Sequence, residues 1–127
     1  MSKIETFQKE RTEYNDVLAK YANSSQKRFY GLDAKTYEAG ALDKKTKELL
    51  GFVASLVLRC DDCILYHLIE SHKAGVDSKE LADAVSIGLL VGGSITIPHI
   101  RRAIDVWDKE LGGLDDQQEL AQLVNAV

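Results

Sequence analysis

A chain of 127 residues is about the size of one domain, and a 45% hydrophobic composition can supply one core, so we expect a single folded unit over residues 1–127. With 16 basic and 20 acidic side chains the net charge is −4, which argues against nucleic-acid binding, because such proteins present a basic face. The polar N-terminus and the absence of a long apolar run predict neither a signal peptide nor a membrane span, and hence a cytoplasmic protein.

The composition favours helices throughout. The sequence has one proline and nine glycines, and Ala, Leu, Glu and Lys are frequent. No stretch alternates apolar and polar residues as strands do, so we predict an all-α fold of about six helices. The first is expected over residues 4–24, where apolar side chains recur at helical spacing. Residues 25–42 have weaker periodicity and receive no assignment.

The middle of the chain predicts two consecutive helices. Asp43 can cap a helix that continues to about Arg59, and its apolar residues cover almost every direction, which indicates a central, buried helix. A second helix is expected to begin at Asp61 or Asp62 and to end at Gly75, where a left-handed residue is favoured. The Cys-x-x-Cys pair therefore lies at a helix N-terminus.

Start and stop signals delimit the remaining helices. Asp77, followed three residues later by Glu80, resembles a capping box. It begins a helix that stops at the glycine pair 92–93. Pro98 begins another helix that ends at a second glycine pair. A short final helix is expected over residues 118–126.

The two cysteines, Cys60 and Cys63, carry the clearest chemistry. Inside a cell this spacing is used for a redox disulfide or for half of a metal site. At about 100° per residue, Cys63 and His67 lie one turn apart on one helix face. The helix N-terminus and the imidazole would both lower a thiol pKa. The charges of Asp61 and Asp62 would oppose this unless these side chains turn outward.

Glu48 is the candidate acid near this pair. It enters the predicted buried helix near its start, and a buried carboxylate is costly unless it is paired. On one continuous helix Glu48 and Cys60 would differ by about 120°, so they can share a site only if the helix breaks near Arg59. A solvent-facing Glu48 in the first turn fits the sequence about equally well.

Taken in order, Glu48, Cys60, Cys63 and His67 resemble the motif of the carboxymuconolactone decarboxylase family, in its alkylhydroperoxidase D-like (AhpD-like) branch. The resemblance covers residues 41–105 and implies an all-helical subunit that forms trimers or hexamers. It implies a thiol-dependent peroxidase or disulfide reductase with alkyl hydroperoxide reductase activity and no metal or organic cofactor. A peroxide would be the substrate, and a thiol or dithiol protein would supply electrons.

The resemblance also implies a role for each of these residues. Cys63 would attack the peroxide and become the sulfenic acid, while Cys60 would donate a proton and then close the disulfide. His67 and Glu48 would pass the proton. The best-known members carry a histidine before the second cysteine, where this chain has Asp62, which leaves the peroxidase efficiency open. Decarboxylase-type lyases of the family lack the cysteine pair, so its presence points away from that alternative.

Other functions fit the same residues. A zinc-binding module would use Cys60, Cys63 and His67, with a fourth ligand from His72, His99 or Glu48. A redox-sensing oligomer would change its packing on disulfide formation without turning over a substrate.

Two further features lie in the predicted Pro98 helix. His99, Arg101 and Arg102 could bind an anion at the helix start or form a solvated face, and we favour the solvated face. Trp107 is interpreted as a core or interface residue.

Overall fold

The computed structural model describes residues 2–113, and the regular structure in that range is helical, which confirms the all-α prediction. Its six α-helices are α1 (Lys3–Tyr21), α2 (Ser24–Thr36), α3 (Lys44–Leu58), α4 (Asp61–Lys73), α5 (Ser78–Gly92) and α6 (Ile97–Val106). A 3-10 turn (Ser94–Thr96) precedes α6, and a π-helical turn (Trp107–Leu111) follows it. The helix predicted over residues 118–126 lies outside the described residues.

Most helix boundaries follow from the predicted caps. The Asp43 side chain accepts the N–H of Thr46 at 2.8 Å and begins α3. Asp77 and Glu80 form the predicted capping box of α5, and Gly75 adopts a left-handed φ of 94° after α4. Helix α2 forms in the segment that received no assignment from the sequence, and a capping box at Asn23 begins it.

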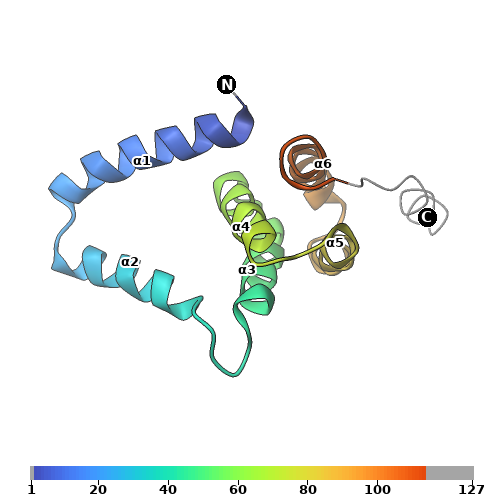
Figure 1. The fold of residues 1–127 in the computed structure, drawn as a ribbon, viewed down its shortest axis with the longest axis horizontal. Helices are drawn as coiled ribbons and strands as arrows, with labels where there is room; N and C mark the ends of the chain where they lie inside the picture. Colours follow the sequence, from blue (N-terminus) through green and yellow to red (C-terminus); the bar gives the residue numbers. More distant parts are fainter. Residues whose placement is uncertain (1, 114–127) are drawn as a thin grey trace.

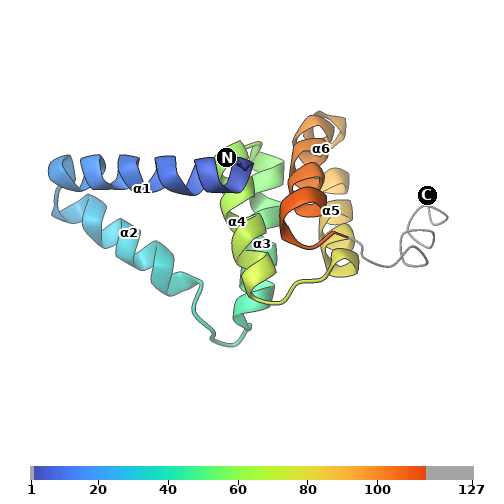
Figure 2. The same cartoon turned by 45° about the horizontal axis from the view of Figure 1, so that its top comes forward.

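Helices α3 and α4 form a hairpin that packs against α5 and α6 (Figures 1 and 2). The core contains apolar side chains from all four helices and the π-helical turn, among them Phe52, Leu56, Leu68, Leu81, Val106 and Trp107. Each such side chain contributes about 1.5–3 kcal/mol through burial. Of the two interpretations of Trp107, core or interface, the structure shows the core, and the indole N–H donates to Ser78 Oγ at 2.9 Å.

Helix α3 is buried on one face only, so the expectation of a helix buried all round is wrong for the single chain. Its buried residues include Phe52 and Leu56, whereas Leu50 is 54% exposed and Leu58 is 76% exposed. The difference arises because α4 and α5 cover only part of the circumference of α3, and its remaining apolar face borders an open groove.

The hairpin turn separates the two functional helices. Arg59 has a left-handed conformation, with φ 58° and ψ 41°, which ends α3. The N–H of Cys60 donates to the Ser55 carbonyl at 3.1 Å, and α4 then begins in the opposite direction. The helix break that a shared site for Glu48 and Cys60 requires is therefore present.

Helices α1 and α2, which we call the arm, extend to one side of the bundle (Figure 1). Neither contains a buried residue. The arm is attached near its ends, since the Ile4 N–H donates to Glu110 Oε1 at 3.0 Å and Lys47 Nζ donates to the Thr36 carbonyl at 2.9 Å. No helix in the described part of the chain is both long and apolar enough to cross a membrane.

Candidate active site

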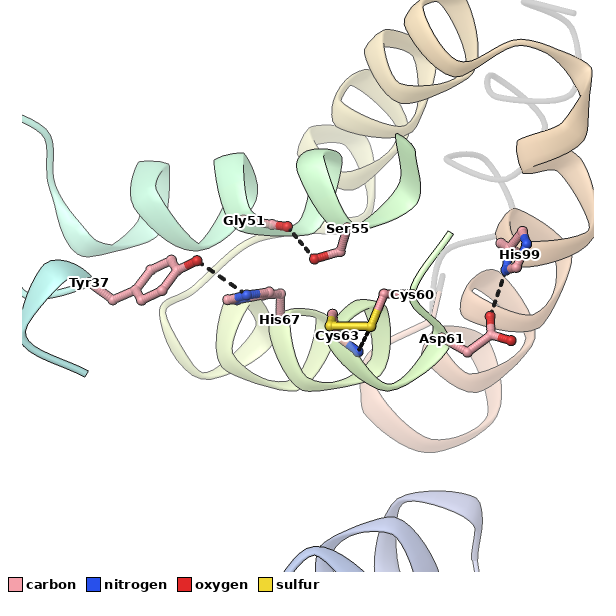
Figure 3. Close-up of a disulfide and its surroundings, with 8 residues drawn as sticks. All are labelled: Tyr37, Gly51, Ser55, Cys60, Asp61, Cys63, His67 and His99. Atoms are coloured by element: carbon pink, nitrogen blue, oxygen red, sulfur yellow. Dashed lines mark hydrogen bonds and ion pairs between the residues drawn. A yellow bond between two sulfur atoms is a disulfide. The ribbon is translucent and has the colours of Figure 1, made fainter. Parts of the chain in front are cut away.

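Cys60 and Cys63 lie at the start of α4, as predicted, and are joined by a disulfide (Figure 3). Cys60 is the N-cap residue, and its Sγ accepts the N–H of Cys63 at 3.3 Å. Cys63 is exposed, whereas Cys60 is half-buried. When the disulfide is reduced, the positive end of the α4 dipole will stabilise a thiolate here.

Glu48 and His67 form a buried pair between α3 and α4. The Nδ1 of His67 lies 2.9 Å from Oε2 of Glu48, and the two residues are 8% and 1% exposed. Lys44 Nζ donates to the other carboxylate oxygen at 3.0 Å. Both oxygens of Glu48 therefore have a partner, which is what a buried carboxylate requires. The solvent-facing alternative for Glu48 is wrong.

Tyr37 belongs to this network and was missed by the sequence analysis. Its hydroxyl lies 3.3 Å from Nε2 of His67, and the two ring centroids are 4.9 Å apart. Figure 3 shows the imidazole directed toward Tyr37, with the disulfide on the other side of His67. Tyr37 immediately follows α2, in the segment 25–42 that the sequence leaves unassigned, and only the folded chain brings it to His67.

One tautomer of His67 satisfies both of its hydrogen bonds in this network. If Nδ1–H donates to Glu48, a neutral imidazole has its lone pair at Nε2, where it accepts the Tyr37 O–H. Burial, and then the charges of Asp33 and Glu48, raise the pKa of Tyr37. The hydroxyl therefore stays protonated and remains a donor to His67.

Gly51 of α3 makes room for the contact between these two side chains. A Cβ at this position would lie 2.8 Å from the Tyr37 hydroxyl oxygen and 2.9 Å from Cε1 of His67. Any larger residue would therefore push one of the two rings away.

Asp61 turns away from the cysteines. Its carboxylate lies 2.7 Å from Nδ1 of His99 and accepts from Arg102 at 3.1 and 3.2 Å. Burial alone would raise the pKa of Asp61, but the hydrogen bonds and charges of His99 and Arg102 outweigh it and lower the pKa. His99 and Arg102 thus bind the Asp61 carboxylate, an anion that the chain itself supplies. Arg101, like Arg102, is exposed. Asp62 remains exposed beside Cys63.

The predicted zinc ligands do not converge. Within residues 2–113, no group of three or more His, Cys, Asp or Glu side chains is arranged to hold a metal ion. His72 is exposed and packs edge-on against Trp107, with centroids 5.5 Å apart. His99 is engaged with Asp61.

Fold and site together define a small protein, helical over the described residues, with a disulfide-forming Cys-x-x-Cys pair at the N-terminus of α4. His67, one turn further along α4, is paired with buried Glu48 of α3. The model of the carboxymuconolactone decarboxylase family matches residues 24–106. The chain belongs to this family, as its resemblance predicted.

Solved structures agree with this assignment. A crystal structure of TM1620 from Thermotoga maritima superposes on this chain with a TM-score of 0.79 at 41% identity. The match covers 97% of this chain and 99% of the TM1620 chain. A second TM1620 structure, with a TM-score of 0.77 and 42% identity, covers 95% of this chain and 94% of the other. It is described as a carboxymuconolactone decarboxylase family protein for which a part in the antioxidative response is suggested.

Curated relatives are more distant. "Uncharacterized protein 4 in cox locus" of Paracoccus denitrificans is 26% identical over 81 residues, which is 64% of this chain and 73% of that protein. "Uncharacterized protein H16_B0147" of Cupriavidus necator is 25% identical over 80 residues, which is 63% of this chain and 71% of that protein.

The crowding at Gly51 predicts an energetic coupling with Tyr37. Gly51→Ala gains helix propensity but forces the Tyr37 hydroxyl to move, so its cost in unfolding free energy should be smaller in a Tyr37→Phe background. We expect a coupling of about 1 kcal/mol from a double-mutant cycle measured by urea unfolding. Additive effects would show that Tyr37 does not occupy this position in solution.

The Asp61 contacts predict a specific acid dependence of stability. The folded-state pKa of Asp61 lies below the ordinary value of 3.8. The stabilisation that its contacts give is therefore present above that value and is lost as the pH falls through the folded-state pKa. Unfolding free energy should therefore decrease less steeply in acid for Asp61→Asn than for the wild type. This difference in pH dependence should vanish when both proteins also carry His99→Gln and Arg102→Gln. If the unfolding free energies of the wild type and Asp61→Asn fall equally steeply with pH, Asp61 is not stabilised by these contacts.

Proposed function

We propose that this protein is a thiol-dependent peroxidase or disulfide reductase in which Cys60 and Cys63 alternate between dithiol and disulfide. The observation that carries the proposal is an exposed Cys63 at a helix N-terminus, one turn from His67, which is itself paired with buried Glu48. Family membership and the antioxidative part suggested for TM1620 are consistent with it. The proposed electron donor is a thiol or dithiol protein.

In the proposed cycle the cysteine pair reduces a hydroperoxide, and a dithiol donor then restores the pair. The Cys63 thiolate attacks a hydroperoxide, an S–O bond forms as the O–O bond breaks, and the leaving alkoxide takes a proton to become an alcohol. Cys60, which has given up that proton, then attacks the sulfenic acid as a thiolate, so that an S–S bond forms and hydroxide leaves and takes a proton from solvent to become water. A dithiol donor returns two electrons and two protons and becomes a disulfide. In this scheme Cys60 releases the proton, and His67 with Glu48 passes it on.

We also propose that the chain assembles as a homo-oligomer, a trimer or a hexamer. Large apolar side chains are exposed on the arm and along α3 and α5. They include Tyr21, Phe29 and Leu32 on the arm, and Leu50, Leu58, Ile87, Leu90 and Val91 on α3 and α5. Further copies of the chain would remove this surface from water.

Light scattering on purified protein tests the assembly. The mass should be three or six times the 14.1 kDa of one chain. Replacing Ile87 and Leu90 by lysine should lower the mass, because charged groups would then be buried at the contact. A wild-type protein with the mass of one chain would contradict the proposal.

The redox proposal is tested by mass spectrometry after one equivalent of hydrogen peroxide. The wild type should lose about 2 Da, mapped to Cys60 and Cys63, and dithiothreitol should restore it. Cys60→Ser should stop at a sulfenic acid that dimedone traps, and Cys63→Ser should leave the peroxide unreduced. His67→Ala should raise the pKa of the Cys63 thiol.

Metal analysis on the same samples completes the test. Thiols that do not react, together with one zinc ion per chain, would replace the redox proposal by a structural metal site. Equal thiol pKa values in the wild type and His67→Ala would remove His67 from the activation.

A further inference from the structure

A pocket of about 420 Å³ opens directly on the reactive cysteine, and the arm forms one of its walls. On one side, Cys63 and His67 of α4 line the pocket. The facing wall contains residues of α1 and also Asp33 of α2. A small molecule that reaches Cys63 through this pocket therefore contacts the arm, and the volume lies in the range of small-ligand sites.

Aromatic side chains give this pocket an apolar surface. Phe7 and Tyr14 contribute from α1, and Tyr66 contributes from α4. The guanidinium of Arg11 lies over the Tyr66 ring, 4.6 Å from its centroid, which connects the arm to α4 at this point. Tyr14 is 66% exposed, so its ring is available to pack on a bound molecule.

The charged residues that line the pocket are mostly acidic. Glu10, Asp33 and Asp62 carry carboxylates, and in the described part of the chain none of the three forms an ion pair. Arg11 is the one Lys or Arg in the lining, and its charge is already placed over an aromatic ring. With three carboxylates against one guanidinium, the charged side chains of the lining repel an anion that approaches Cys63.

We propose that the inner face of the arm selects what reaches Cys63: uncharged or cationic molecules with an apolar or aromatic body are accepted, and anions are rejected. The identity of the natural molecule as a hydroperoxide rests on the proposed function. In that case an uncharged hydroperoxide is reduced to its alcohol and water by the two electrons of the cysteine pair. The selection by charge belongs to the pocket and acts on any reagent that attacks this thiol.

A neutral and an anionic alkylating agent of nearly equal size measure this selection. The reduced protein is treated with iodoacetamide or iodoacetate, and the rate at Cys63 is read by mass spectrometry. The reference is an unfolded peptide spanning residues 59–65, which retains Asp61 and Asp62. At low ionic strength the protein should disfavour iodoacetate about five- to tenfold more than the peptide does, and added salt should weaken the difference.

Paired variants locate the effect on the arm. Glu10→Gln with Asp33→Asn should bring the ratio of the two rates toward that of the peptide. Glu13→Gln with Asp16→Asn removes the same charge from α1 outside the pocket lining and should keep the wild-type ratio. Equal ratios in the two double variants, or a wild-type ratio equal to that of the peptide, would overturn the proposal.

A second pair of probes separates this inference from the proposed function. Cumene hydroperoxide and its 4-carboxylate differ by one charge, and hydrogen peroxide reports the chemistry without an organic body. Reduction of cumene hydroperoxide with a five- to tenfold preference over the carboxylate supports both claims. If none of the three peroxides oxidises the thiols while the alkylation ratio shows the preference, the proposed function fails and the pocket assignment stands. Reduction of both organic peroxides at equal rates contradicts the pocket assignment alone.

Discussion

The contact between the Glu48 carboxylate and the His67 imidazole is the interaction on which the candidate site depends. It lies in the interior between α3 and α4, where an unpaired carboxylate would cost several kcal/mol. This cost fixes the position of α3 along α4, because any shift would separate the two groups. It also fixes the ring of His67, since Nδ1 is held by Glu48 and Nε2 by Tyr37.

The helix that carries the cysteines is contacted from two sides by parts of the chain that are distant in sequence. On one side the arm reaches His67 through Tyr37 and packs Arg11 over Tyr66. On the other side α6 holds the Asp61 carboxylate. The second contact removes the opposition that Asp61 would otherwise present to a thiolate, because its charge is balanced by Arg102. Residues of α6 thus balance a charge at the start of α4, and Tyr37, which follows the arm, contacts the His67 ring.

Much of the fold could be predicted because it depends on local chemistry. The caps at Asp43 and Asp77 and the left-handed Gly75 are dictated by residues within a few positions of each helix end, so sequence patterns were sufficient. Helix α2 could not be predicted in this way, because it has no buried face to produce periodicity and is held by its capping box and by Lys47.

The site was predictable only in part, because only some of its contacts lie within one helix. Cys63 and His67 are one turn apart on one helix, so their proximity follows from helix geometry. The burial of Glu48 depends on how α3 crosses α4, and the role of Tyr37 depends on where the arm returns to the bundle. Neither is encoded in local spacing. The pairing of Asp61 with His99 and Arg102 spans about forty positions of sequence and was likewise beyond a local pattern.

The central claim is that the buried Glu48–His67 pair serves the cysteine pair. The most direct measurement is the rate constant for oxidation of Cys63 by hydrogen peroxide in Glu48→Gln, which keeps the size of the side chain and removes its charge. If the pair relays the proton, the rate constant should decrease about 100-fold with unchanged helical circular dichroism, which is the scale typical of a lost acid–base group. A folded variant that reacts at the wild-type rate would contradict it and would reduce the pair to a packing interaction.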